Sequence, residues 1–159
     1  MISSAVMRAL ILAALLALPL PAASVAAEDP FTGRWKLDET KVRNQPETPR
    51  TQFLSIEVAG ARITITHQGV DAKGAPVEWA IHADLEGKLF GVIDSPDTDF
   101  VRCWRSDPHT LLLKIIRNSS TARWETAELS KNGKSLKVTQ TTLDAKGKET
   151  KSVLWFDKQ

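Results

Sequence analysis

Short alternating segments separated by turn residues make up almost all of this chain from Phe31 to its last residue. Within each segment, apolar and polar residues alternate or β-branched residues predominate, which is typical of half-buried β-strands. No long stretch carries apolar residues at the spacing of an amphipathic helix. We therefore predict an all-β protein with strands at 31–37, 51–58, 61–67, 75–84, 87–93, 98–105, 109–118, 121–130, 134–144 and 148–157.

The connections between these segments indicate antiparallel neighbours. Ala59-Gly60, Glu86-Gly87 and Asn132-Gly133 supply residues that tolerate positive φ in tight hairpin turns. Consecutive antiparallel strands leave two exposed edges unless the sheet closes on itself. We predict a single antiparallel up-and-down β-barrel of about 8–10 strands, wide enough for one small ligand. The alternative is a β-sandwich, which needs longer crossover connections than this chain shows after Arg50.

The first 27 residues have the pattern of a secretory signal peptide. Arg8 precedes an apolar run at 9–18, and small residues lead up to Ala27. A run of about ten apolar residues is too short to span a bilayer as a helix. We predict cleavage after Ala27, a barrel domain over 28–159, and export to the periplasm or the extracellular space. An uncleaved membrane anchor is the alternative.

Composition narrows the classes of partner. The chain has 21 Lys and Arg against 19 Asp and Glu, and this near-balance gives no electrostatic footprint for nucleic acid. We expect no nucleic-acid partner, no stable membrane insertion and a monomer. Cys103 is the only cysteine, so an intramolecular disulfide is excluded. We expect its thiol to be buried as a small hydrophobic group.

Alternation also predicts which side chains face the interior. The regular segments place inward Leu54, Ile56 and Val58; Ile63, Ile65 and His67; Val77, Trp79, Ile81 and Ala83; and Leu136, Val138, Gln140 and Thr142. Two segments alternate less clearly. In these, Phe100, Arg102 and Trp104 share one face of 98–105, and Ala122, Trp124, Thr126 and Glu128 share one face of 121–130.

These faces define a candidate ligand site. An apolar base would be walled by three aromatic residues, and four polar groups would orient a small amphipathic molecule. The candidate residues are His67, Trp79, Arg102, Trp104, Trp124, Glu128 and Gln140. The alternative is that Arg102 and Glu128 face solvent while the tryptophans fill the core.

Catalytic patterns are missing from the sequence. His67, His82 and His109 are scattered, and the chain has no Gly-x-Ser-x-Gly, His-x-His or His-Glu-x-x-His motif. We predict that the protein is not an enzyme and has neither a metal site nor a cofactor. The longest connection, 38–50, contains Pro46 and Pro49 and is either a structural loop or a lid over the open end.

The start of the first strand carries a family resemblance. Phe31, Gly33 and Trp35, together with the closing strand at 153–156 and the Asn132-Gly133-Lys134 turn, resemble lipocalin-like (calycin-type) small exported bacterial β-barrel proteins. The resemblance implies that Trp35 plugs the closed end of the barrel and is structural. It also implies haem, held through His67, as one variant ligand.

Two functional hypotheses follow from the sequence. The first is a non-enzymatic exported binding protein that holds a small hydrophobic or amphipathic ligand inside the barrel. The second is an envelope protein-interaction module whose barrel is filled by its own side chains and holds no small molecule.

Overall fold

The computed structural model describes residues 27–44, 50–143 and 146–159. The predicted signal peptide lies outside these residues except for Ala27, and so do positions 45–49 of the connection predicted as loop or lid. Each of the ten predicted strands is present, and a short 3-10 helix precedes the second. The elements are β1 (Gly33–Leu37), η1 (Glu39–Lys41), β2 (Arg50–Ala59), β3 (Arg62–Val70), β4 (Pro76–Asp84), β5 (Phe90–Gly91), β6 (Phe100–Asp107), β7 (Thr110–Arg117), β8 (Ser120–Leu129), β9 (Ser135–Leu143) and β10 (Glu149–Lys158).

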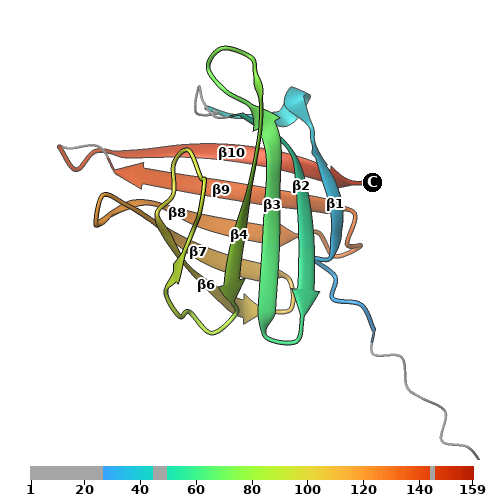
Figure 1. Ribbon diagram of the computed structural model, residues 1–159. Coiled ribbons are helices and arrows are strands. Elements are labelled where there is room, and N and C mark those ends of the chain that lie inside the picture. The colour runs from blue at the N-terminus through green and yellow to red at the C-terminus, as the bar shows by residue number, and fades with distance from the viewer. Residues whose placement is uncertain (1–26, 45–49, 144–145) are drawn as a thin grey trace, which may run out of the picture.

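The strands form one antiparallel sheet that curls into a nearly closed barrel (Figure 1). Each strand pairs with its neighbours in the chain, except that β4 and β5 do not pair with each other, and β1 pairs with β10. The sheet order therefore runs β4-β3-β2-β1-β10-β9-β8-β7-β6-β5. This up-and-down arrangement confirms the predicted barrel and excludes the sandwich. The free edges of the sheet are β4 and β5.

The residues that follow β4 bond to β6, the neighbour of β5, and this junction is here called the barrel seam. Arg105 N donates to Leu85 O at 3.3 Å, and Glu86 forms a β-bridge with Trp104. Gly87 has φ +84°, and a Cβ there would lie 1.8 Å from Nε1 of Trp104. Only glycine therefore lets the indole lie across this turn. The predicted strand 87–93 is consequently short, because the chain crosses the seam before β5 begins.

The end of the barrel at which the chain enters, here called the Trp35 end, is filled by aromatic side chains. Phe31 and Trp35 have no exposed surface, and Trp35 Nε1 donates to Phe31 O at 3.0 Å. Arg105 pairs with Asp29 at 2.7 Å and lies over the ring of Phe31. These contacts seal the Trp35 end, and Trp35 is a core residue, as the resemblance implies.

A β-bulge in β2 shapes the opposite end. The register with β3 shifts between Thr51 and Phe53, which lets Thr51 face the interior together with Leu54. A Cβ on Gly69 would lie 1.8 Å from Arg50 O, so the bulged backbone approaches β3 only because this position is glycine. The bulge thus brings a hydroxyl group to the barrel interior.

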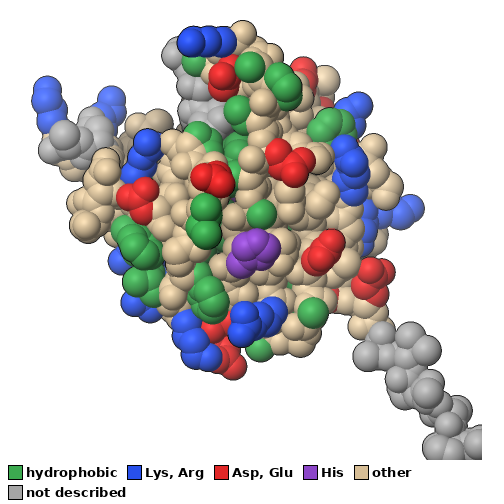
Figure 2. All heavy atoms as spheres, viewed as in Figure 1, with side chains coloured by type: hydrophobic (Ala, Val, Ile, Leu, Met, Phe, Trp, Pro, Cys, Tyr) green, Lys and Arg blue, Asp and Glu red, His purple; other side chains and the backbone are tan. Residues whose placement is uncertain are grey.

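The outer surface over β2, β3 and β4 carries interspersed charges. On this face, acidic side chains are scattered between hydrophobic ones, and basic side chains lie mostly toward the edges (Figure 2). No helix in the described ranges has the length and hydrophobicity needed to cross a bilayer.

Candidate functional site

A small cavity of about 40 Å³ lies inside the barrel. By the space that one water molecule needs, it has room for about three. Nine of its lining residues are large hydrophobic side chains from β2, β3, β7, β9 and β10: Leu54, Ile56, Ile65, Leu111, Leu113, Leu136, Val138, Leu154 and Phe156. Ala127 adds a small apolar wall. This part of the cavity favours an apolar body.

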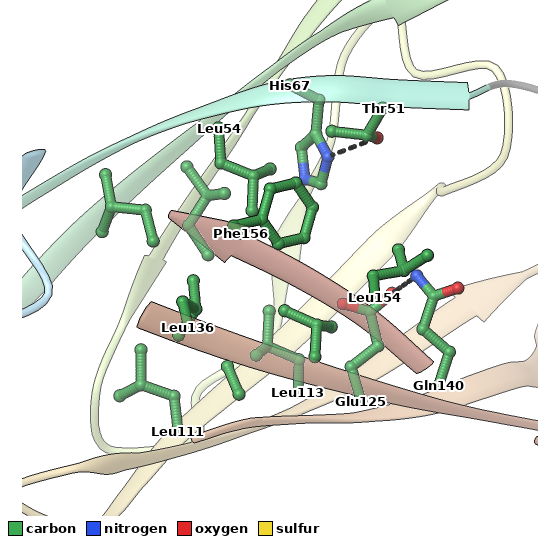
Figure 3. A pocket seen from close by; sticks show the side chains of 14 residues that line it. Thr51, Leu54, His67, Leu111, Leu113, Glu125, Leu136, Gln140, Leu154 and Phe156 are labelled. Carbon is green, nitrogen blue, oxygen red and sulfur yellow. Dashed lines mark hydrogen bonds between the residues drawn. The ribbon is translucent and has the colours of Figure 1, made fainter. Parts of the chain in front are cut away.

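The remaining lining residues are polar and gather at the end away from Trp35, here called the polar end. They are Thr51, His67, Glu125 and Gln140. Figure 3 shows Glu125 and Gln140 side by side, with His67 and Thr51 across the cavity from them. The cavity therefore has an apolar part and a polar end.

Strand register builds the Glu125 side of this end. Glu125 on β8 is opposite Gln140 on β9, and Gln140 is opposite Ser152 on β10. Gln140 Nε2 donates to Glu125 Oε1 at 3.0 Å, and Ser152 Oγ donates to Gln140 Oε1 at 3.2 Å. The three side chains thus form one hydrogen-bonded row on the inner faces of three neighbouring strands.

Arg123 anchors this row from behind. Its Nε donates to Glu125 Oε1, and its Nη1 donates to Asp97 Oδ2 at 2.6 Å. Burial alone would lower the pKa of Arg123, but the carboxylates of Glu125 and Asp97 outweigh burial and raise that pKa. Burial would likewise raise the pKa of Asp97, but Arg123 and the hydroxyl groups of Thr98 and Ser95 together outweigh burial and lower that pKa. Arg123 and Asp97 are therefore ionised at neutral pH, and Arg123 forms an ion pair with each of the two carboxylates.

His67 forms the other side of the polar end. Its Nδ1 lies 3.2 Å from Thr51 Oγ1, and its ring stacks on that of Trp79. Burial lowers the pKa of His67 to about 4, so the imidazole is neutral at pH 7. The indole Nε1 of Trp79 is buried without a hydrogen-bond partner in the described part of the chain.

Three of the predicted site residues lie where the alternation places them. His67 and Gln140 line the cavity. Trp79 is buried on the inner face of β4, behind His67 rather than at the cavity wall.

For Arg102 and Trp104, the prediction of an inward face is wrong. Val101 and Cys103 are fully buried in β6, which turns the intervening residues outward. Arg102 Nη1 donates to Gly87 O at 2.8 Å, and Trp104 covers Gly87. Both residues hold the barrel seam from outside.

For Trp124 and Glu128, the inward prediction is also wrong. Trp124 is 44% exposed and stacks on Trp104 with ring centroids 6.3 Å apart. Glu128 is exposed and pairs with Lys137 at 3.0 Å. The buried residues of β8 are Glu125, Ala127 and Leu129, one position out of phase with the predicted face.

Sequence reasoning missed Thr51, Asp97, Arg123, Glu125 and Ser152. A signal for part of this set is present in β8, where the apolar pair Ala127 and Leu129 extends by period two to Glu125 and Arg123. Opposite charges two residues apart on one strand face neutralise each other, so such a pair tolerates burial. No comparable local signal marks Asp97, whose partner is 26 residues away.

Metal binding and thiol chemistry find little support within residues 27–44, 50–143 and 146–159. No group of three His, Cys, Asp or Glu side chains there is placed to hold a metal ion. Cys103 is fully buried, and burial raises the pKa of its thiol to about 12.

Comparison with known proteins adds no assignment. No protein-family model matches the chain, and no curated protein matches it in sequence.

Proposed function

We propose that this protein is an exported, non-enzymatic binding protein of lipocalin-like type, which holds a small ligand inside its barrel. The observation that carries the proposal is the two-part cavity wall, with large hydrophobic residues on one side and Thr51, His67, Glu125 and Gln140 at the polar end. Pockets that bind small molecules combine an apolar wall with a few convergent polar groups in this way.

The size of the cavity restricts the ligand. A volume of about 40 Å³ is far below the several hundred Å³ of a typical drug-sized site. The proposal is therefore a ligand with a short apolar chain and one polar head, rather than a fatty acid or haem.

A second candidate is the protein-interaction module with a filled barrel. The observation that favours it is an aromatic patch on the outer faces of β6 and β8, where Phe100 is 42% and Trp124 is 44% exposed. Lys114 Nζ lies 5.2 Å from the Trp124 ring. Exposed aromatic residues beside a cation are common at protein interfaces.

Native mass spectrometry of the protein recovered from the producing cell separates the two candidates. The binding protein carries an added mass that is lost on denaturation, and the filled barrel is bare. The signal-peptide proposal is read from the same spectrum, because cleavage after Ala27 leaves Glu28 as the first residue.

A matched pair of variants locates the bound molecule. Ala127→Val adds two methyl groups to the cavity wall, whereas Ala80→Val adds them to the outer face of β4. We expect the added mass to disappear in Ala127→Val and to persist in Ala80→Val. A bare mass in the unsubstituted protein overturns the ligand-binding proposal.

A further inference from the structure

The cavity wall carries one kind of charge. Of the fourteen side chains that line it, among the residues that the structure describes, Glu125 is the only one with a carboxyl group, and none is a lysine or an arginine. His67 is neutral there, and the other lining residues are apolar, hydroxyl or amide side chains. A head group that enters the polar end therefore meets a carboxylate.

The nearby cation does not offset this charge at the cavity. Arg123 is not part of the wall, and its side chain bonds both Glu125 and Asp97. One guanidinium thus serves two carboxylates, and the cluster keeps a net negative charge. An acidic ligand would have to displace Asp97 from Arg123 or approach Glu125 with like charge.

One carboxylate oxygen of Glu125, Oε2, is available to accept a hydrogen bond from a ligand. Its Oε1 takes the hydrogen bonds from Arg123 and Gln140, whereas no hydrogen bond from the described residues reaches Oε2. The side chain is only 8% exposed, so a donor that reaches Oε2 from the cavity bonds a carboxylate in a largely desolvated setting. Charge-assisted hydrogen bonds in such settings are about twice as strong as neutral ones.

Resting on the proposed binding function, we infer that the ligand is a short-chain primary amine, whose ammonium head bonds Glu125 while its carbon chain lies among the hydrophobic residues of the cavity. Gln140 and Ser152 hold the carboxylate in place through their hydrogen-bonded row.

Three probes with the same chain length test this inference: butylammonium, butanol and butyrate. Binding is followed by methyl NMR at pH 7. Leu113 and Val138 report on the cavity, and Leu112 and Val153 report on the outer faces of β7 and β10. We expect butylammonium to shift only the cavity methyls and to bind about tenfold more tightly than butanol. Butyrate should bind most weakly.

Glu125→Gln removes the charge and keeps the shape. We expect this variant to bind butylammonium and butanol with equal affinity within about threefold, while Glu128→Gln, an exposed change on the same strand, keeps the tenfold preference. If Glu125→Gln does not fold, the ranking of the three probes on the unsubstituted protein still decides.

The possible outcomes separate this inference from the function on which it rests. Tightest binding of butyrate, or equal binding of butanol and butylammonium, overturns the amine assignment and leaves a small-ligand barrel standing. If none of the probes shifts the cavity methyls, both proposals fail.

Discussion

The imidazole of His67 lies flat against the indole of Trp79, with ring centroids 4.7 Å apart and planes inclined by 3°. The two residues are cross-strand partners on β3 and β4. Glu125 and Asp97 favour the protonated imidazole and Arg123 disfavours it, but burial is the largest influence. Burial therefore keeps a neutral imidazole at the polar end of the cavity.

This burial predicts that protonation of His67 destabilises the fold. The pKa falls from about 6.5 in the unfolded chain to about 4 in the native protein, so the unfolded state binds more protons between these values. Stability is lost as the pH falls through this window. We expect the free energy of unfolding to drop by about 2 kcal/mol between pH 7 and pH 4.5 because of His67.

Chemical denaturation at both pH values checks this. In His67→Gln, the free energies of unfolding at pH 7 and pH 4.5 should become nearly equal as far as this histidine sets them apart. His82→Gln, an exposed substitution on the outer face of β4, should retain the full difference between the two pH values. An unchanged pH dependence in His67→Gln contradicts the argument.

The buried ion pairs of Arg123 and the exposed ion pair of Glu128 should differ strongly in their contribution to stability. Arg123→Met leaves Glu125 and Asp97 without their cation in a largely buried setting, and we expect a loss of about 3 kcal/mol of stability. Lys137→Met breaks the exposed pair with Glu128 and should cost less than about 1 kcal/mol. Urea denaturation measures both values. Equal losses would show that the Arg123 cluster is not effectively desolvated.

Arg102 should matter for stability and not for binding. Its Nη1 holds Gly87 O at 2.8 Å on the outside of the barrel seam. We expect Arg102→Ala to lower the free energy of unfolding by about 1 kcal/mol and to leave the affinity for every probe unchanged. Thermal denaturation and probe titration of the same sample check this. A selective loss of butyrate binding would return Arg102 to the ligand site.

The β7–β8 turn offers a stabilising substitution. Asn118 and Ser119 have φ values of +50° and +60°, the region that a two-residue hairpin turn requires and that serine adopts at a cost. Ser119→Gly should raise the free energy of unfolding by about 0.5–1 kcal/mol. Urea denaturation is the measurement. A decrease in stability would mean that Ser119 contributes a compensating contact.

The alternation rule located most of the fold because many strands have one apolar and one polar face. β2, β3, β4 and β9 show this contrast, and their inward residues were predicted correctly. In β6 the contrast is absent, because Phe100 and Trp104 on the outer face are as apolar as Val101 and Cys103 on the inner face. The alternation of residues along β6 therefore does not show which of its two faces points into the barrel.

The candidate site was harder to predict because it depends on tertiary pairing. A bulge at Ala122 shifts the register of β8 against β7, so the partly buried Ala122 is followed by the inward Arg123. Arg123 is tolerated inside only because Glu125 and the distant Asp97 meet it. A single sequence shows these charged residues, but it does not show that Asp97, in the loop before β6, pairs with Arg123.

The most direct measurement is a set of intermolecular NOEs between butylammonium and the protein in solution. We expect contacts from the terminal methyl of the probe to Leu111 and Leu136, and from the carbon next to nitrogen to Gln140 and His67. Contacts only to Phe100, Trp104 or Trp124 on the outer surface would contradict the account, because they would place binding outside a filled barrel.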